Sequence, residues 1–459
     1  MWRFDRLDRV ALGSIVILAS LTGLIVLRGD QVGARVRQTT PPPSAVNVST
    51  RSPIALVFTE PMSAPTVLER VRIEPPISGA WRWSGSAVFF QPSAALQPDT
   101  TYSVTLSAGA TSLRGRPLLE AYTWHFRTRR PRLTFLAPAS GRPNLFVLDL
   151  VEETRQQLTD EPFGIYDYAI SPDGSRVVYS ADRAAQDAER DLYLLSLDEG
   201  RRELLVACDG QVCQSPSWSA DGTRIAYERR TLVQGAIGRS PGPGRIWLAD
   251  IATKQTAPLF ADSQQIASLP RFAPVGEKLA FYDPNATAIV VVDLSTEQRV
   301  ELPSVLGDSG TWSPDGTQLV YPDLRAYEAD SYDQLLRADL SAGVITALTP
   351  LEAKRHTGPT WSPLGDLIAF GRQESPLSGG VLGPQLWLIA SDGTNRRPLS
   401  NEPTISHGAL AWSPDGAWIA VQRYNLLEVN ALPEVWVFKV DGSVRRRIAA
   451  DAMLPAWLP

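Results

Sequence analysis

The residues with the clearest capacity for chemistry are two histidines, His356 and His407, in a chain that has three. Each stands five residues before a tryptophan, Trp361 or Trp412, that opens a W-S-P-x-G motif. Two imidazoles at equivalent places in neighbouring repeats suit a metal ion, an anionic ligand or a polar contact at a channel mouth. A zinc site needs a third or fourth ligand, and the repeat region has no further histidine, so we predict no metal site and no cofactor.

The two cysteines, Cys208 and Cys213, flank the turn-forming residues D-G-Q-V. Outside the cytoplasm, a pair this close in a turn-rich segment usually forms a disulfide. Cys-x4-Cys without further ligands is a poor metal signature. The sequence therefore predicts a Cys208–Cys213 disulfide, which is consistent with export.

Two segments match serine-hydrolase motifs without the context that the chemistry requires. Residues 238–242 read G-R-S-P-G, but they lie in a Pro/Gly-rich segment and not between a strand and a helix. Residues 307–310 read G-D-S-G, yet no histidine is suitably placed to act as the base. We therefore assign no catalytic residue.

These residues must be positioned by a repeat that fills most of the chain. The motif W-S-P-D-G returns every 40 to 54 residues, and four strand-like runs accompany each copy. A recurrence of this length with four strands per unit is typical of a β-propeller blade. Within the motif, Pro and Asp-Gly favour a tight turn, and the tryptophan is expected to anchor the inner strand against a neighbouring blade. The motif glycines are Gly174, Gly222, Gly276, Gly316, Gly365 and Gly416.

The two ends of the repeat region are incomplete in complementary ways. Residues 132–159 supply three strands without a preceding motif, and residues 453–459 supply a lone inner strand in which Trp457 matches Trp412. Together they complete one blade and pair two free strand edges. We therefore predict an all-β fold with a seven-bladed propeller over residues 130–459; six blades is the alternative.

Residues 44–129 show short alternating runs without a helical run, which predicts a small antiparallel β-sandwich. The segment resembles the bacterial Ig-like domain of the S-layer (SbsA-like) type. That resemblance implies an extracytoplasmic spacer or adhesion module, not an enzyme. The motifs that carry it are F-T-E-P-M at 58–62, W-R-W-S-G-S-A-V-F-F-Q-P at 81–92, L-Q-P-D-T-T-Y-S-V-T-L at 96–106 and W-H-F-R-T at 124–128.

The W-S-P-D-G repeats resemble those of the TolB-like family of propellers, and also those of tricorn, prolyl-oligopeptidase and other WD-like propellers. The resemblance covers about 330 residues and is specific for the fold, not for a function. TolB-type propellers have six blades, so a count of seven is a departure. Peptidases with this propeller carry an α/β-hydrolase domain as well, and we expect that domain to be absent.

Residues 10–27 form an uninterrupted uncharged run of 18 residues. At about 1.5 Å per residue the run covers about 27 Å, just enough to cross a bilayer. Three arginines precede it and three follow it, so the exported character of the remaining chain decides the orientation. We expect a short cytoplasmic head and transmembrane helix at 1–27, a Pro-rich linker at 28–43 and an extracytoplasmic remainder. A cleaved signal peptide is the alternative.

The loops between the second and third strands of the blades are long, and they all lie on one face of a propeller. Excess loop length on one side of a rigid scaffold favours binding there. Solvated loops explain the same charges without any ligand. The long loops are 181–190, 229–244, 323–333, 372–384 and 423–433, and the blade containing 283–287 is the exception. Four candidate ligand-binding residues lie on these loops, Arg229, Arg230, Tyr327 and Tyr332, and the other two candidates are His356 and His407 near the channel mouth.

The sequence therefore predicts a non-catalytic, single-pass protein of the bacterial cell envelope that binds a protein or a glycan through its long-loop face. A net charge of −5 argues against nucleic acid as a partner. One alternative is an enzyme of the lyase or cyclase type with its site at the channel mouth. The other is a purely structural surface-layer component.

Overall fold

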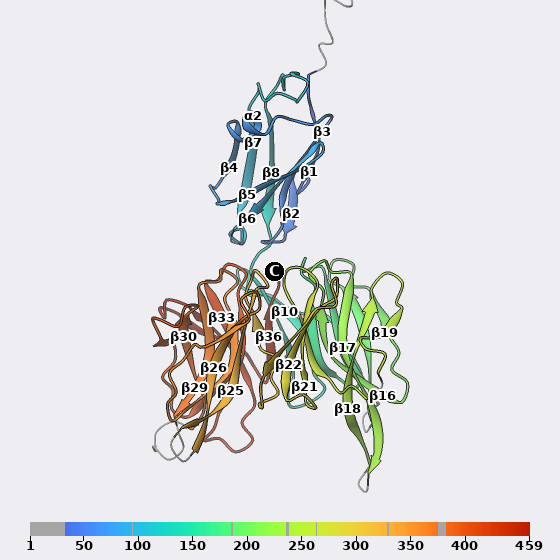
Figure 1. Cartoon of the computed structure of the whole chain (residues 1–459), viewed down its shortest axis with the longest axis vertical. Coiled ribbons are helices and arrows are strands. Elements are labelled where there is room, and N and C mark those ends of the chain that lie inside the picture. Colours follow the sequence, from blue (N-terminus) through green and yellow to red (C-terminus); the bar gives the residue numbers. More distant parts are fainter. Residues whose placement is uncertain are drawn as a thin grey trace, which may run out of the picture. The chain divides into compact units, whose positions relative to one another are not determined.

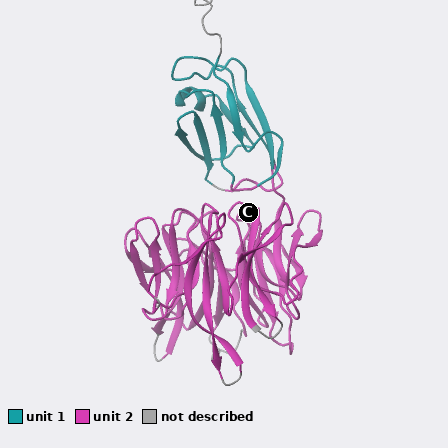
Figure 2. Ribbon diagram, turned by 90° about the vertical axis from the view of Figure 1, so that its right-hand side faces the viewer, with its two compact units in different colours: residues 1–48, 52–93, 101–127 teal, residues 49–51, 94–100, 128–459 magenta. Residues whose placement is uncertain are grey.

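The chain forms two compact units, and each is described by itself (Figure 2). Among the described residues no helix is long and apolar enough to cross a membrane, and the helix predicted within 1–27 lies outside them. The computed structural model describes residues 33–93, 95–184, 187–235, 238–262, 264–327, 330–374 and 382–459. Unit 1 comprises residues 1–48, 52–93 and 101–127, and unit 2 comprises residues 49–51, 94–100 and 128–459.

Unit 1 is a sandwich of two four-stranded antiparallel sheets (Figure 1). Its strands are β1 Val36–Thr40, β2 Ala45–Val48, β3 Ile54–Phe58, β4 Val71–Glu74, β5 Gly79–Ser84, β6 Ala87–Pro92, β7 Thr101–Leu106 and β8 Tyr122–Thr128. The sheet orders are β1-β3-β6-β5 and β2-β8-β7-β4. Alternation along β7 and β8 buries Tyr102, Val104, Trp124 and Phe126 between the sheets, as the period-2 pattern predicts.

The predicted linker at 28–43 is wrong in its second half, because Val36–Thr40 pairs with Ile54–Phe58 as strand β1. The segment V-R-Q-T-T reads as polar because β1 is an edge strand in which only Thr39 is buried. The sandwich also contains one short helix, α2 (Ala64–Leu68), where no helix is expected from the sequence. Proline at the start of α2 suits a helix N-terminus, since its missing N–H has no partner to lose there.

Unit 2 is a ring of four-stranded blades, and seven can be traced in the described part of the chain. The predicted count of seven is thereby confirmed. The strands are β9 Arg132–Ala137, β10 Asn144–Asp149, β11 Arg155–Gln157, β12 Ile165–Ile170, β13 Arg176–Ala184, β14 Asp187–Ser196, β15 Arg202–Val206, β16 Gln211–Trp218, β17 Arg224–Gly235, β18 Gly238–Asp250, β19 Thr256–Pro258, β20 Ser268–Phe272, β21 Lys278–Asp283, β22 Ala288–Asp293, β23 Arg299–Pro303, β24 Thr311–Trp312, β25 Gln318–Tyr327, β26 Asp330–Asp339, β27 Val344–Ala347, β28 Lys354–Trp361, β29 Leu367–Glu374, β30 Gln385–Ala390, β31 Arg397–Pro398, β32 Ile405–Trp412, β33 Trp418–Asn425, β34 Glu434–Lys439, β35 Arg445–Ala450 and β36 Met453–Trp457. From the inner strand outward the blades are β36-β9-β10-β11, β12–β15, β16–β19, β20–β23, β24–β27, β28–β31 and β32–β35.

The propeller closes by strand pairing between the two ends of unit 2. The last strand, β36, pairs antiparallel with β9, with Trp457 opposite Leu133. One blade is therefore built from both ends of the repeat region, as predicted, and the ring leaves neither of these strand edges unpaired.

The W-S-P-D-G motif folds into the same turn in successive blades. At Asp315 the carboxylate oxygen Oδ1 accepts hydrogen bonds from the Ser313 hydroxyl at 2.6 Å and from the Thr317 N–H at 3.1 Å. Gly316 has a φ of 67°, a conformation that glycine adopts without a steric penalty. The motif is therefore turn chemistry and not a binding signature.

Four of the motif tryptophans join their inner strand to the preceding blade. In each of these four blades the indole N–H donates to a backbone carbonyl of the preceding blade. The acceptor residue stands one position before the residue that matches the tryptophan there. Trp361 differs, because its indole donates to Gly365 in its own turn at 3.2 Å. The four bonds run from Trp218 to Ala169 at 3.0 Å, from Trp312 to Arg271 at 3.0 Å, from Trp412 to Thr360 at 2.9 Å and from Trp457 to Ala411 at 3.1 Å.

Five inner strands carry a β-bulge at one level, three residues before the motif tryptophan or the phenylalanine that replaces it. A bulge leaves backbone groups outside the ladder, and these need other partners. The Ser215 N–H donates to the Asp167 carboxylate of the preceding blade at 2.7 Å, and the Leu454 N–H donates to Gln422 at 2.8 Å. The residues at this level have a positive φ: Ser215, Leu269, Gly358, Ala409 and Leu454.

Three segments predicted as long loops are mainly strand. The hairpin of β17 and β18 continues, with a register shift between Arg230 and Leu232, as far as Gly235 opposite Gly238. The segments 181–190 and 323–333 also extend as ladders. A ladder satisfies the backbone groups of a projecting segment, whereas an irregular loop leaves them to water. The described residues of 423–433 remain a true loop after β33, since β33 ends at Asn425.

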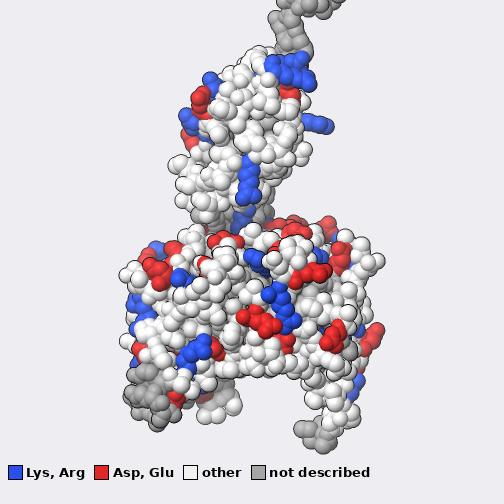
Figure 3. All heavy atoms as spheres, viewed as in Figure 1, with Lys and Arg blue, Asp and Glu red and all other residues white. Residues whose placement is uncertain are grey.

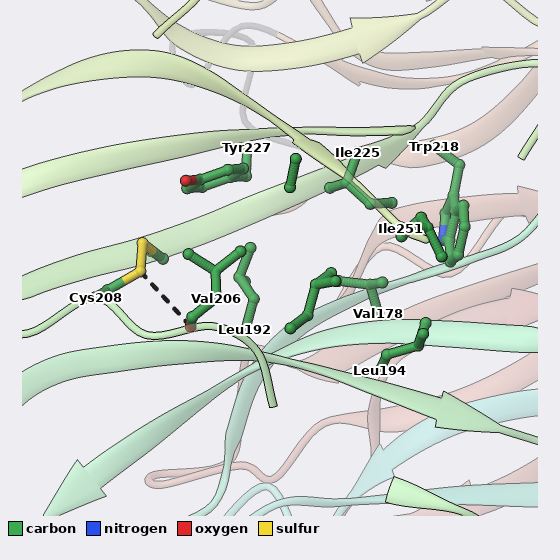
Figure 4. Packing of buried hydrophobic residues seen from close by; sticks show 12 residues of the cluster. Val178, Leu192, Leu194, Val206, Cys208, Trp218, Ile225, Tyr227 and Ile251 are labelled. Atoms are coloured by element: carbon green, nitrogen blue, oxygen red, sulfur yellow. Dashed lines mark hydrogen bonds between the residues drawn. A yellow bond between two sulfur atoms is a disulfide. The ribbon is translucent and has the colours of Figure 1, made fainter. Parts of the chain in front are cut away.

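The cysteines lie inside a hydrophobic cluster between the blades β12–β15 and β16–β19 (Figure 4). Cys208 and Cys213 are joined by a disulfide with a Cα–Cα distance of 6.2 Å, and both are fully buried. Val206, Leu192 and Tyr227 pack around them.

Substitution of Trp457 by alanine is expected to lower the free energy of unfolding of the propeller by about 3–5 kcal/mol, because it empties a buried site. Trp457 belongs to the cluster formed by Leu133, Val435 and Val437, where both ends of unit 2 meet. Trp457→Phe keeps most of the apolar volume and loses the bond to Ala411, so it should cost only about 1 kcal/mol. Urea unfolding followed by fluorescence measures both, and equal losses in the two variants would contradict this account of closure.

Asp167 is expected to make stability fall as the pH rises. Burial raises the pKa of this carboxyl from its ordinary 3.8 to about 6, although Ser180 and Ser215 bond to it. The folded chain thus holds the proton more tightly than the unfolded chain, so stability gained below pH 4 is lost as the pH passes 6. Asp167→Asn should remove the part of the unfolding free energy that changes with pH through this carboxyl. That part is about 1–2 kcal/mol after allowance for partial solvent exposure.

The measurement is the difference in unfolding free energy between the two proteins from pH 4 to pH 7. Asp392→Asn serves as the control, because bonds from Thr394 lower the pKa of Asp392. Its difference from the parent protein should stay constant above pH 5. A flat difference for Asp167→Asn over the same range would disprove the assignment.

Candidate functional site

The long-loop face is the side of the propeller formed by the second-to-third hairpins and by the connections between blades. The hairpin of β17 and β18 projects visibly from this side in Figure 1. Inner strands begin here, because each follows a connection from the previous blade. The candidate residues predicted from the sequence all lie on these elements.

His356 and His407 occupy equivalent positions near the starts of β28 and β32. His356 Nδ1 lies 2.7 Å from the Asp333 carbonyl oxygen, and His407 Nδ1 lies 3.2 Å from that of Pro384, each in the preceding blade. A carbonyl only accepts, so Nδ1 carries the proton in both rings. Both imidazoles are buried and pack on a phenylalanine, Phe370 or Phe438. Each histidine therefore joins two blades.

An arginine faces each histidine from the second strand of its blade. Arg372 is paired with His356, and Arg423 with His407. The guanidinium carbon of Arg372 lies 4.4 Å from the ring centre of Trp387, and that of Arg423 lies 4.0 Å from Trp436. These stacked arginines were not predicted. In the sequence they can be recognised by position, because each stands two residues after a buried residue of the same strand: Arg372 after Phe370 and Arg423 after Val421.

A glutamate completes each cluster and compensates the arginine charge. Glu352 lies 3.2 Å from Arg372 and 2.7 Å from Arg396, and Glu402 lies 3.1 Å from Arg423. Burial opposes ionisation of Glu352, but the two arginines outweigh it and hold the pKa of that carboxyl below its usual value. Burial lowers the pKa of His356, which favours its neutral form. The clusters are thus compensated networks, not acid–base pairs open to solvent.

The disulfide takes the histidine position in the blade β16–β19. Cys213 stands five residues before Trp218 and is paired with Arg229, whose guanidinium lies 4.7 Å from the ring centre of Trp247. The same register therefore holds either an imidazole or a disulfide beside a stacked arginine. Both fill the space between two blades.

The other predicted residues lie apart from the histidines. Arg230 pairs with the buried Glu228 at 2.7 Å, within the blade that carries Arg229. Tyr332 lies on the exposed part of β26, 3.3 Å from Asp330. Tyr327 ends β25, and its side chain lies outside the described part of the chain. Among the described residues no hydrogen bond or ion pair joins the two histidines, and no group of three or more His, Cys, Asp or Glu is arranged to hold a metal ion.

The feature that the sequence analysis missed is apolar. In the loop after β33 the side chains of Leu427 and Val429 are 67% and 92% exposed, and Leu426 and Leu432 are also exposed. Leu382 of the neighbouring blade is 55% exposed. We call these five residues the leucine patch. Its signal in the sequence is the run N-L-L-E-V-N-A-L-P, in which apolar residues appear where a solvated loop is expected.

The leucine patch is held by backbone bonds to one connection between two blades. The Leu382 N–H donates to Pro403 at 3.0 Å, and the Leu426 N–H donates to Thr404 at 2.8 Å. The two loops therefore lie against adjacent residues of the same segment. Persistent apolar exposure on a fixed backbone is typical of an interaction surface.

Comparison with known proteins matches both units to described families. Residues 30–128 match the bacterial Ig-like domain, and residues 209–457 match the TolB beta propeller domain. The S-layer subtype of the Ig-like domain stays a prediction. The general assignments made from sequence motifs are confirmed.

Similar proteins differ widely in what they do. TolB of Acinetobacter baumannii is 15% identical, with a TM-score of 0.45, over 85% of this chain and 83% of that one. An oligogalacturonate lyase of Vibrio parahaemolyticus is 15% identical, with a TM-score of 0.51, over 67% of this chain and 85% of that one. The uncharacterised peptidase YuxL of Bacillus subtilis is 24% identical over 221 residues, which are 47% of this chain and 30% of that protein.

At these identities the solved structures show the fold alone, and the chain spans less than a third of the length of YuxL. The match to the TolB propeller domain, in contrast, covers more than half of the chain. The chain therefore belongs to the TolB beta propeller domain family and carries a bacterial Ig-like domain ahead of its propeller.

Proposed function

We propose that the protein is a single-pass, membrane-anchored component of the bacterial cell envelope whose propeller binds another protein, without catalysis, through its long-loop face. The leucine patch is the observation that carries this proposal. Val429 is almost fully exposed, and its neighbours Leu426, Leu427 and Leu432 share the same side of the blade β32–β35. Burial of such side chains releases about 25 cal/mol per Å² of apolar surface, which favours association with an apolar counterpart.

A protein is a better partner for this patch than a glycan. Aliphatic side chains offer no hydrogen bonds, so sugar hydroxyls placed on them would lose bonds to water without replacement. Another protein can present its own apolar side chains to Leu427 and Val429. The nearby guanidinium of Arg423 is already paired with Glu402 at 3.1 Å.

Membrane anchoring is part of the same proposal and rests on the sequence. The uncharged run at 10–27 is long enough to cross a bilayer as a helix. The buried Cys208–Cys213 disulfide suits an oxidising compartment outside the cytoplasm. An Ig-like domain of the bacterial type agrees with that location.

The alternative of an enzyme at the channel mouth receives no support from a specific observation. Its proposed residues, His356 and His407, are buried, and each ring is tied to a backbone carbonyl. A purely structural role is an outcome of the binding test and not a separate proposal.

Charge placed on the leucine patch is expected to abolish binding while leaving the fold intact. Leu427→Asp with Val429→Asp places two carboxylates at largely exposed positions, so the free energy of unfolding should change by less than about 0.5 kcal/mol. A photo-crosslinking residue at position 432 in the full chain should trap one protein species in cells that produce it. The double variant should reduce that product at least tenfold.

The matched control is Val275→Asp, which alters an exposed valine in a motif turn on the opposite face. It should leave the crosslinked product unchanged. If no crosslink forms although the protein is folded, a structural role replaces the binding proposal. If the patch variant still crosslinks normally, the surface is wrongly assigned.

Protease treatment of intact spheroplasts tests the proposed topology. The full chain should stay in the membrane fraction after a carbonate wash, and external protease should digest residues beyond about 40, because the propeller lies outside. Protection of the propeller in intact spheroplasts, with digestion after lysis, would reverse the orientation. Release of the chain by carbonate would refute the anchor.

A further inference from the structure

One end of unit 1 combines exposed leucines with arginines at the point where the described chain begins. This entry end consists of residues 33–35, α2 and the loop 107–121 between β7 and β8. The side chains of Leu113, Leu119 and Leu68 are 73%, 59% and 39% exposed there. They belong to a well-packed domain, so their exposure requires an explanation.

The backbone of the entry end is firmly held. The Ala34 N–H donates to the Pro117 carbonyl at 3.1 Å, and the Leu113 N–H donates to Pro61 at 2.9 Å. A Cβ at Gly33 would lie only 2.6 Å from Cγ of Leu119, so the incoming chain lies directly against the loop. Leu113 and Leu119 are therefore presented by a fixed backbone beside the point of entry.

Arginines belong to the same end of unit 1, together with the exposed Glu120 next to Leu119. Arg35 and Arg114 are exposed, and Arg116 is partly offset by Glu60 at a distance of 3.8 Å. Arginine side chains lie at this end of unit 1, with acidic side chains beside them (Figure 3). The charge is regional: residues 33–128 contain nine Arg and five Asp or Glu, whereas residues 129–459 contain 31 Lys or Arg and 41 Asp or Glu. A cationic unit in an acidic protein favours an anionic surface as its counterpart.

The length of chain before residue 33 places this end close to the proposed anchor. Six residue steps separate Leu27, the end of the uncharged run, from Gly33. Fully extended, they reach at most about 20 Å. Whatever the path of those residues, the entry end stays within that distance of the bilayer interface if residues 10–27 cross the membrane.

We propose that the entry end of unit 1 rests on the headgroups of an anionic phospholipid bilayer. Leu113 and Leu119 enter the interfacial layer, and Arg35 and Arg114 pair with lipid phosphates. This inference rests on the proposed membrane anchor and adds to it a second contact, made by the folded domain itself. That contact would orient unit 1 on the membrane, which an anchor alone does not do.

The test uses the full chain with Leu113→Cys, labelled with an environment-sensitive fluorophore. The native cysteines form a fully buried disulfide, so labelling is selective under non-reducing conditions. The protein is reconstituted into vesicles of phosphatidylcholine, with or without phosphatidylglycerol. With phosphatidylglycerol, the emission should shift to the blue and quenching by acrylamide should fall several-fold.

The matched control is Val46→Cys, a site of 68% exposure on β2, remote from α2 within the sandwich (Figure 1). Its emission should be the same in both lipids. Charge reversal by Arg35→Glu with Arg114→Glu should return the Leu113→Cys signal to that seen in phosphatidylcholine alone. High salt should weaken the shift, because exposed charges are screened.

Two failures are distinguishable. If the chain floats with the vesicles but the probe at 113 is quenched equally in both lipids, the headgroup contact is refuted and the anchor stands. If the chain does not float with either vesicle, the anchor itself fails and this inference falls with it.

Discussion

Hydrogen bonds that cross from one blade to the preceding one are the interaction on which the propeller depends, and in four blades a motif tryptophan makes one. In the described part of the ring, neighbouring blades share no sheet ladder apart from a single parallel bridge between Arg190 and Val212. The blades are therefore joined by side chains that cross from one to the next and by single backbone bonds, such as that from the His407 N–H to Pro384 at 2.9 Å. Trp457 donates to Ala411, and Tyr168 of the following blade donates to Leu454 at 2.7 Å, so the closing strand is fastened on both sides. The closing strand β36 is thus joined to its neighbours by the same kind of hydrogen bonds as the other blades.

The same requirement explains the polar residues on the long-loop face. Bulges in the inner strands leave backbone groups that only the neighbouring blade can satisfy, and Asp167 does this for Ser215. His356 and Cys213 stand in the same register, one as a hydrogen-bonded ring and the other as half of a disulfide. Side chains of such different chemistry at one position share a structural role, which is to fill the space between two blades and join them. They do not share a role in one reaction.

The repeat spacing predicted the blades, their closure and the equivalence of His356 with His407, because turn residues and strand periods are local properties. The repeat spacing did not predict in which direction the arginine side chains point or how far they are buried. Whether Arg229 and Arg372 face solvent or a tryptophan depends on a ladder partner more than ten residues away. The strand β1 was taken for a spacer because an edge strand buries too few side chains to show alternation. The leucine patch was missed because loop composition alone does not reveal which face of a loop the scaffold covers.

The exposed leucines of the two units are comparable in physical terms, although they are proposed to meet different partners. Leu113 and Leu426 are each fixed by a backbone bond to a packed segment, so neither loop needs to be ordered when it binds. That lowers the entropic cost of association and makes the apolar area effective. The surroundings then decide the partner. Arginines beside Leu113 favour phosphate headgroups, whereas the arginines nearest the leucine patch are stacked and paired with glutamates, so apolar contact dominates the binding energy there. The proposals of a protein partner for the propeller and a lipid surface for the Ig-like unit therefore differ because the charge near the exposed leucines is compensated in one unit and not in the other.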